Sequence, residues 1–506
     1  MTDDMQKFDF YQDPYESAYG MKFLGEFPVK SSSDLQNTPM GIGFETLDRD
    51  TFDPAKFYDL IGESGVKYAR CQTGWMKCEK QKGIYDFQWL DDIVDELGKR
   101  GIKVWFSLSF GNPLYTPVPE YEAKREEAER TGSKLSSRVR GYVGEVPLYH
   151  GEEAVAGWLN YVKALARHFR GRVNEFEVWN ETVYLGLFWN YLGKAPYPEL
   201  PLIARLRRCA KDYVELIRIT GKAVKEEIPE ARIAACSANA ASEYVRFLGE
   251  FGVSDVADIF SYHVYGNNES YTQRRVDFAR SCLGPKMEFW QGESGRATGK
   301  SVLFQLPTEH TQAKFIARRA MIDLKCGAKR SSIFTLTDLN HYYPDGSDQK
   351  YGVIDGYTYT PKMGYYALQT AASLLENTES ASDLFVKFGP TDSRLFTTAG
   401  RYNIETVTFR RNGYPCAAIW VHDTTDISVA PVKGELQLMF GDPAKFKDPV
   451  VIDTLRRRVY AVGHLKYPDW AYGTAVINPF EVPDYPVVIA DRAAFPELSE
   501  IMKTEK

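Results

Sequence analysis

From about residue 40 to residue 377, short apolar runs alternate with amphipathic helical stretches, and this alternation limits the possible folds more than any other feature of the chain. Residues 87–97 and 152–170 carry apolar side chains three and four positions apart, which indicates helices. Strands joined by helices pair in parallel. Eight runs rich in β-branched or aromatic residues are strand candidates: 40–46, 66–72, 103–110, 173–181, 232–238, 258–265, 286–293 and 331–337.

Eight strand–helix units predict an α/β protein with a closed (β/α)8, or TIM, barrel. An open doubly wound sheet could also hold eight strands. That alternative is disfavoured because no Gly-rich phosphate loop follows the first strand candidate. The polar, proline-containing stretch at 111–151 is expected to form a long loop after the third strand, on the side where barrel loops shape a cleft.

After residue 377 the pattern changes to short strands separated by turn signals. Arg411-Asn412-Gly413 predicts a hairpin turn between two of them. We therefore expect an N-terminal segment (1–39) that packs on the β-domain, a barrel (40–377) and an accessory C-terminal antiparallel β-sandwich domain (378–506), which serves as a structural brace rather than a carbohydrate-binding module. The strand candidates of the sandwich are 384–388, 405–410, 417–422, 436–440, 450–454 and 486–490.

Composition excludes several classes of protein. With 44% hydrophobic residues, 26% charged residues and a net charge of -6, the chain is neither disordered nor a nucleic-acid binder. The start lacks a basic and apolar leader, and no run of about 18 apolar residues occurs, so we expect a cytoplasmic protein with no membrane segment. The seven Cys, without metal-ligand spacing, predict free or buried thiols. No metal or organic cofactor is expected. A homo-oligomer is possible, since the sequence does not predict the oligomeric state.

Two glutamates end strand candidates on opposite sides of the predicted ring. Glu181 ends the fourth strand, and Glu293 ends the seventh. The dipeptide Asn-Glu occurs three times, at 174–175, 180–181 and 268–269, but only Asn180-Glu181 lies where an apolar strand ends. Cleavage of a glycosidic bond with retention needs two carboxyl groups about 5 to 5.5 Å apart. We predict Glu181 as general acid/base and Glu293 as nucleophile; a solvated strand-end carboxylate is the alternative for either residue alone.

The segments around these residues resemble glycoside hydrolase clan A over residues 41–375, most of all family 39 and related β-glycosidases. The resemblance rests on Trp179-Asn180-Glu181, on Glu293, and on Trp75 followed by the 79–91 segment, in which Lys80 replaces a usual Pro. It implies a retaining glycosidase that cleaves β-glycosidic bonds through a covalent glycosyl-enzyme, with an oligosaccharide or other glycoside as substrate.

The resemblance also suggests supporting residues. It implies that Arg70 stabilises the nucleophile side of the site, since a guanidinium beside Glu293 would keep that carboxylate ionised; a salt bridge at the barrel rim is the alternative. His263 and Tyr265 end the sixth strand, from which either could reach Glu293 or the sugar, or simply pack in the barrel. The amide of Asn180 is placed to bind the sugar 2-hydroxyl.

Several aromatic residues are candidates to stack on sugar rings. Packing in the core or at the rim is the alternative for each of them. Tyr342, Tyr343 and His341 fall in the loop after the eighth strand, which favours them as binding residues. The other candidates are Trp75, Trp179 and Trp290.

The chain departs from the family 39 pattern at three places. Thr182 replaces the usual Pro after the acid/base, Ser294 follows the nucleophile instead of an aromatic residue, and residues 334–337 lack the Trp common at the end of the eighth strand. The sugar is therefore left open. The rival hypotheses are a transglycosylase with the same two carboxylates, an inactive carbohydrate-binding barrel, and a metal-dependent hydrolase or isomerase, for which His263 is the only strand-end histidine.

Overall fold

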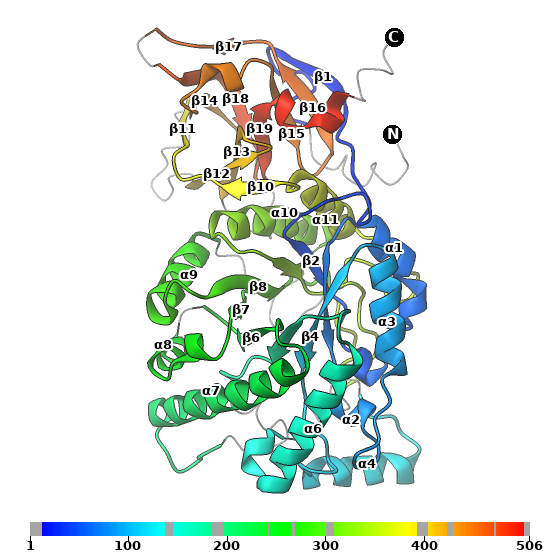
Figure 1. The fold of residues 1–506 in the computed structure, drawn as a ribbon. Coiled ribbons are helices and arrows are strands. Elements are labelled where there is room, and N and C mark those ends of the chain that lie inside the picture. The colour runs from blue at the N-terminus through cyan, green and yellow to red at the C-terminus, as the bar shows by residue number, and fades with distance from the viewer. Residues whose placement is uncertain are drawn as a thin grey trace.

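The computed structural model describes residues 13–136, 145–184, 196–240, 242–265, 269–299, 308–391, 403–422, 429–469 and 472–499. Its central unit is a closed barrel of eight parallel strands, β2 to β9 in ring order, which confirms the predicted fold (Figure 1). Pairing of Met40 with Ser331 joins the first strand to the last. The strands are β2 (Met40–Gly43), β3 (Tyr68–Gln72), β4 (Lys103–Leu108), β5 (Glu175–Val178), β6 (Arg232–Ser237), β7 (Ile259–His263), β8 (Glu288–Ser294) and β9 (Ser331–Ile333).

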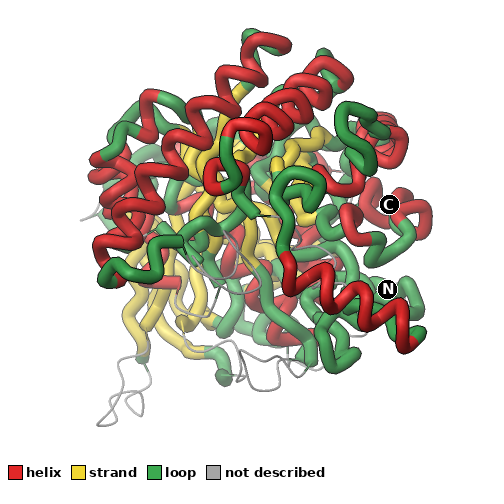
Figure 2. The backbone as a smooth tube through the Cα atoms, turned by 90° about the horizontal axis from the view of Figure 1, so that it is seen from below, coloured by secondary structure: helices red, strands yellow, loops and turns green. Residues whose placement is uncertain are grey.

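Helices lie around the strands of the barrel, as the view from below shows (Figure 2). Helix α3 buries residues three and four positions apart, such as Leu90, Ile93 and Leu97, which is why the predicted helix forms and packs on the ring. Within the described part of the chain, no helix has both the length and the apolar character to cross a bilayer. The helices are α1 (Tyr58–Glu63), α2 (Trp75–Cys78), α3 (Gln88–Lys99), α4 (Pro119–Thr131), α6 (Glu152–His168), α7 (Leu202–Glu227), α8 (Glu243–Glu250), α9 (Glu269–Leu283), α10 (Glu309–Lys325) and α11 (Met363–Leu374).

The stretch predicted as a long loop after the third barrel strand contains a helix, α4, so that prediction was wrong for residues 119–131. Pro119 occupies the first turn, where its missing N–H costs nothing. Arg125 then pairs with Glu122 and Glu129 at 2.8 Å each, one helical turn away on either side. These local pairs let a charged segment with little apolar surface form a helix. Residues 137–144 of the same stretch lie outside the described residues.

Two antiparallel sheets form a β-sandwich beside the barrel (Figure 1). The N-terminal strand β1 pairs with β16, so the start of the described chain completes the larger sheet. The predicted hairpin is confirmed, because Arg411 faces Tyr414 across a turn in which Asn412 and Gly413 both have positive φ. The larger sheet has the order β1 (Met21–Glu26), β16 (Arg458–Val462), β15 (Pro449–Asp453), β19 (Val487–Asp491), β13 (Tyr414–His422), β12 (Asn403–Arg411) and β10 (Thr378–Ser380); the smaller has β11 (Phe385–Pro390), β14 (Val432–Met439), β18 (Thr474–Val482) and β17 (Leu465–Lys466).

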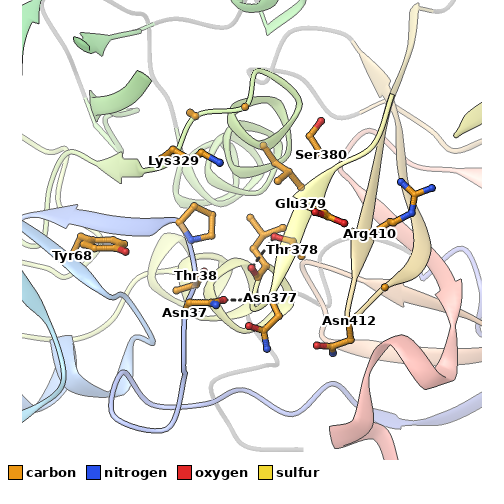
Figure 3. A pocket seen from close by; sticks show the side chains of 16 residues that line it. Asn37, Thr38, Tyr68, Lys329, Asn377, Thr378, Glu379, Ser380, Arg410 and Asn412 are labelled. Atoms are coloured by element: carbon orange, nitrogen blue, oxygen red, sulfur yellow. Dashed lines mark hydrogen bonds between the residues drawn. The ribbon is translucent and has the colours of Figure 1, made fainter. Parts of the chain in front are cut away.

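A pocket of about 600 Å³ lies between part of the barrel and part of the sandwich (Figure 3). On the barrel side it is lined by residues at or before the start of strands, including Pro39, Tyr68 and Lys329, and on the other side by Thr378 and Arg410 of the larger sheet. The pocket therefore lies at the pole of the barrel where strands begin, away from the predicted carboxylate pair. All seven cysteines are free thiols, as expected from their spacing.

Candidate active site

The carboxyl ends of the barrel strands bring Glu181 and Glu293 together. Glu181 follows β5, Glu293 lies at the end of β8, and each residue is 8% exposed. A carboxylate oxygen of Glu181, one of Glu293 and a ring nitrogen of His263 all lie within 4.8 Å of one another. Retaining glycosidases separate their carboxyl groups by about 5 to 5.5 Å, and inverting ones by about 6.5 to 9.5 Å. The pair thus has the spacing of a double-displacement site.

Both oxygens of Glu293 accept hydrogen bonds from side chains elsewhere in the barrel, one in β3 and one just after β7. Arg70 donates from Nη1 to Oε2 at 2.9 Å, and the hydroxyl of Tyr265 donates to Oε1. Burial and the charge of Glu293 raise the pKa of Tyr265 well above its usual range, so its hydroxyl keeps its proton and remains a donor. These two contacts hold the carboxylate in one orientation, as a nucleophile requires.

The side chain of Glu181 is held in place by a contact with the ring of His263. Nδ1 of His263 lies 2.7 Å from Oε1 of Glu181 and 3.6 Å from Oε2 of Glu293. Burial raises the pKa of Glu181, and this effect, to which the negative charge of Glu293 adds, outweighs the opposing contributions of His263 and Arg70. Burial disfavours a charged imidazole, but Cys236, Glu293 and Glu181 around the ring hold the pKa of His263 well above its usual range. A protonated His263 donates to Oε1, which leaves Oε2 of Glu181 to carry the acidic proton.

The backbone around the acid/base candidate is unusual. Trp179 has a φ of 63° and Glu181 a φ of 46°, both in the left-handed region that non-glycine residues rarely adopt. The backbone N–H of Glu181 points at Sγ of Cys236, 3.5 Å away. Such backbone strain persists only where surrounding contacts fix it, and it concentrates at functional sites. Here it occurs at the residue whose side chain contacts His263.

Arg70 is the centre of a polar network that links four strands. It is fully buried, and besides Glu293 it donates from Nε to Glu177 at 3.0 Å and from Nη2 to Asn180 Oδ1 at 2.8 Å. Its Nη1 lies 2.9 Å from Oε2 of Glu45, a residue that follows β2. Burial raises the pKa of Glu177, but the charges of Arg70 and His263, together with the hydrogen bonds that Glu177 accepts, outweigh burial and hold that pKa below its usual value.

Three members of this network were not predicted from the sequence: Glu45, Glu177 and Cys236. Asn180 was predicted, and its carbonyl oxygen is taken by Arg70. Its Nδ2 has no hydrogen-bond partner among the described residues and is the group left to meet a ligand. His263, by contrast, is 0% exposed. It therefore contacts the two carboxylates rather than a sugar.

Two of the predicted stacking residues do not reach the site, and those predictions were wrong. Trp75 is completely buried, stacks on Tyr115 at 5.2 Å and donates to Glu79 at 2.6 Å. Trp290 is also completely buried, and Arg330 lies 3.7 Å from the centre of its ring. Trp290 packs with residues from the starts of strands, so it fills the opposite end of the barrel. Neither ring has a face free for a sugar.

The aromatic residues Tyr342 and Tyr343, which follow β9, pack near Tyr265 and so lie beside the site. Tyr342 is 5% exposed, accepts a hydrogen bond from Arg49 at 3.1 Å, and belongs to a cluster that also contacts Tyr265. Tyr343 packs edge-on against Tyr342, and His341 is exposed. Trp179 is fully buried against Trp158, so it packs in the core. Tyr342 therefore supports the wall of the site with little of its ring open to a ligand.

Residues around His263 form two clusters whose side-chain atoms lie close enough together to bind a metal ion, and no other such cluster occurs in the described part of the chain. One is Glu181, His263 and Glu293, and the other is Glu177, Cys236 and His263. Arg70 already binds carboxylates of both clusters. A divalent cation there would repel this buried guanidinium, so the donor set fits a proton-transfer site better than a metal centre.

Comparison with known proteins supports a glycosidase barrel. Residues 45–171 match a family model described as β-galactosidase, of glycoside hydrolase family 42. A 115-residue segment is 31% identical to β-galactosidase BgaA of Clostridium cellulovorans, covering 20% of this chain and 18% of that protein. An 80-residue segment is 30% identical to β-galactosidase BgaH of Haloferax lucentense, covering 15% and 12%. The chain thus matches less than a fifth of the length of either relative.

A solved structure resembles most of the chain. The family 30 endoxylanase of Clostridium papyrosolvens aligns with a TM-score of 0.51 over 93% of this chain and 98% of its own, at 11% identity. At that identity the likeness shows the fold alone. The matched segment and the closed barrel together support a glycoside hydrolase of clan A, whereas none of these comparisons points to family 39 in particular.

Proposed function

We propose that this protein is a retaining β-glycosidase with Glu293 as nucleophile and Glu181 as general acid/base. The observation that carries the proposal is the separation of at most 4.8 Å between oxygens of these two buried side chains. Burial raises the pKa of Glu181, which favours its protonated form. An acid that keeps its proton beside a carboxylate fixed by Arg70 and Tyr265 is the combination that double displacement needs.

The reaction proceeds in two balanced steps. In the first, a carboxylate oxygen of Glu293 attacks the anomeric carbon while Glu181 gives its proton to the departing glycosidic oxygen. The aglycone leaves, and the sugar stays bound as an ester of Glu293. In the second, Glu181, now ionised, takes a proton from water, whose oxygen attacks the anomeric carbon and frees Glu293. The amide of Asn180 binds the 2-hydroxyl, an interaction that strengthens at the transition state.

We further propose a β-galactoside as the first substrate to test, because the two relatives described above are named β-galactosidases. The matched segment, residues 45–171, contains Arg70 but ends before Glu181, so it bears on the barrel more than on the sugar. The test is a panel of aryl β-glycosides, with the β-galactoside first and Glu293→Ala as the inactive reference. Turnover that Glu293→Ala abolishes supports the proposal. A folded wild-type protein that cleaves no member of the panel contradicts it.

A further inference from the structure

Three buried carboxyl groups share the single guanidinium of Arg70. Glu177, Glu293 and Glu45 are 0%, 8% and 2% exposed, and all three contact Arg70. Glu293 and Glu45 both approach the same nitrogen, Nη1, at 2.9 Å each. Three negative charges around one positive charge, away from water, repel one another strongly. At least one of these groups is therefore held in its neutral form.

The contacts identify Glu45 as that group. Glu177 is bound by both Nε and Nη2 of Arg70, and Glu293 by Nη1 and the Tyr265 hydroxyl. Glu45 has the one contact to Nη1. One oxygen of Glu45 and one of Glu177 are buried without a hydrogen-bond partner among the described residues, but the other oxygen of Glu177 accepts from two nitrogens of Arg70. Burial, reinforced by the charge of Glu293 and opposed by Arg70, raises the pKa of Glu45 to about 8.

The charged groups that face Glu45 come from three other strands. Arg70 in β3 and His263 in β7 favour its ionised form, and Glu293 in β8 disfavours it. Beyond Arg70, Glu177 accepts hydrogen bonds from two nitrogens of that guanidinium. On the segment of Glu45 itself, Asp48 and Arg49 pair with each other at 3.3 Å.

We propose that Glu45 keeps its proton in the working enzyme and is a positioning residue, which braces Arg70 against the carboxylate of Glu293 without adding a charge. The proposal deepens, and rests on, the retaining mechanism given above. With Glu45 and Glu181 both protonated, the two cations Arg70 and His263 balance the two anions Glu177 and Glu293. The buried site is then electrically neutral, and Glu293 does not compete with a second anion for Nη1.

The protonation state is tested by stability, without reference to catalysis. An unfolded chain releases the Glu45 proton above its ordinary pKa of 4.5, whereas the folded protein holds it to about pH 8. Wild type therefore loses stability as pH rises through this window. Glu45→Gln removes that loss, so its melting temperature, measured from pH 4 to 9, should exceed that of wild type by an amount that grows to about pH 8 and then levels off.

Glu177→Gln is the matched control, because it makes the same chemical change on the other side of Arg70. Since the pKa of Glu177 is lowered in the fold, its ionised form stabilises the protein above pH 4.5. Glu177→Gln should melt below wild type at neutral pH, with a deficit that shrinks as pH falls. If Glu45→Gln also melts below wild type at pH 7, or fails to fold, Glu45 is an ionised partner of Arg70 and the proposal is overturned.

The positioning role is tested by kinetics of the folded variants. Glu45 is too buried to touch a substrate, so Glu45→Ala should lower kcat about tenfold or more through misplacement of Arg70, with KM changed less. Glu45→Gln should restore most of that loss. Unchanged kcat in Glu45→Ala, or no rescue by Glu45→Gln, would overturn the role. If wild type has no glycosidase turnover, the proposed function fails, and the melting curves still decide whether Glu45 is neutral.

Discussion

Arg70→Met is expected to destabilise the protein through charge rather than through lost packing. Met keeps much of the apolar length of the side chain, but it leaves the fully buried Glu177 without the cation that holds its pKa down. Removing one partner of a buried ion pair typically costs about 3–5 kcal/mol. We expect a loss of that size at pH 7, measured as the free energy of unfolding in urea.

The pH dependence of this loss separates charge from packing. In wild type the ionised Glu177 contributes stability that is present above its ordinary pKa of 4.5 and is lost as pH falls. The deficit of Arg70→Met should therefore shrink on going from pH 7 to pH 4. The double variant Arg70→Met/Glu177→Gln should be more stable at pH 7 than Arg70→Met alone, because one of the buried charges left without Arg70, that of Glu177, is gone. An equal deficit at both pH values, or a double variant less stable than the single one, would refute this reasoning.

Three further predictions concern single side chains. Glu181→Ala should slow hydrolysis of substrates with poor leaving groups far more than activated aryl glycosides, and azide should restore turnover of the latter; an equal loss for all leaving groups would argue against Glu181 as the acid. Tyr265→Phe removes a donor to Glu293 and should lower kcat by about tenfold or more, whereas Tyr115→Phe, which removes a Tyr–Glu hydrogen bond elsewhere, should not. Trp290→Leu should lower the free energy of unfolding by roughly 3 kcal/mol in a denaturant titration, because the ring is completely buried. The kcat of the folded variant should stay within about twofold of wild type. A large loss of kcat would show that Trp290 contributes to the active site after all.

The barrel could be predicted from the sequence because the length and the composition of its strands distinguish them from the helices between them. Each of the eight predicted runs overlaps an observed strand. The sandwich was predicted less completely: β18 was missed, and Pro479 in it is a poor strand residue. The structure accommodates that proline at a bulge, since the pairing with β14 shifts register between Gly434 and Leu436. Local sequence does not reveal which strand will carry such an irregularity.

The sequence did not reveal how deep each aromatic side chain lies along the barrel axis. Trp290 precedes Glu293 by three residues on β8, and a strand rises about 3.3 Å per residue. That step of about 10 Å moves Trp290 from the mouth into the barrel interior. Trp75 begins a short helix and turns into the core, where Tyr115 covers it.

The missed carboxylates differ in how visible they were. Glu177 lies between Phe176 and Val178 in a strand of the barrel, and parallel strands are buried on both faces, so a charge there already implied a buried partner. Glu45 carries a weaker signal, because it lies near the end of the predicted strand 40–46, where carboxylates are common, and the observed strand already ends at Gly43. Only the convergence of β2, β3 and β8 on Arg70 gives it a role.

The stereochemistry of the first product tests the spacing of Glu181 and Glu293 most directly. Proton NMR can follow cleavage of an aryl β-glycoside from its first minutes, before the released sugar equilibrates between anomers. The account predicts that the β-anomer appears first and the α-anomer grows in later. Initial release of the α-anomer would mean that water attacks directly, and it would contradict the covalent route through Glu293.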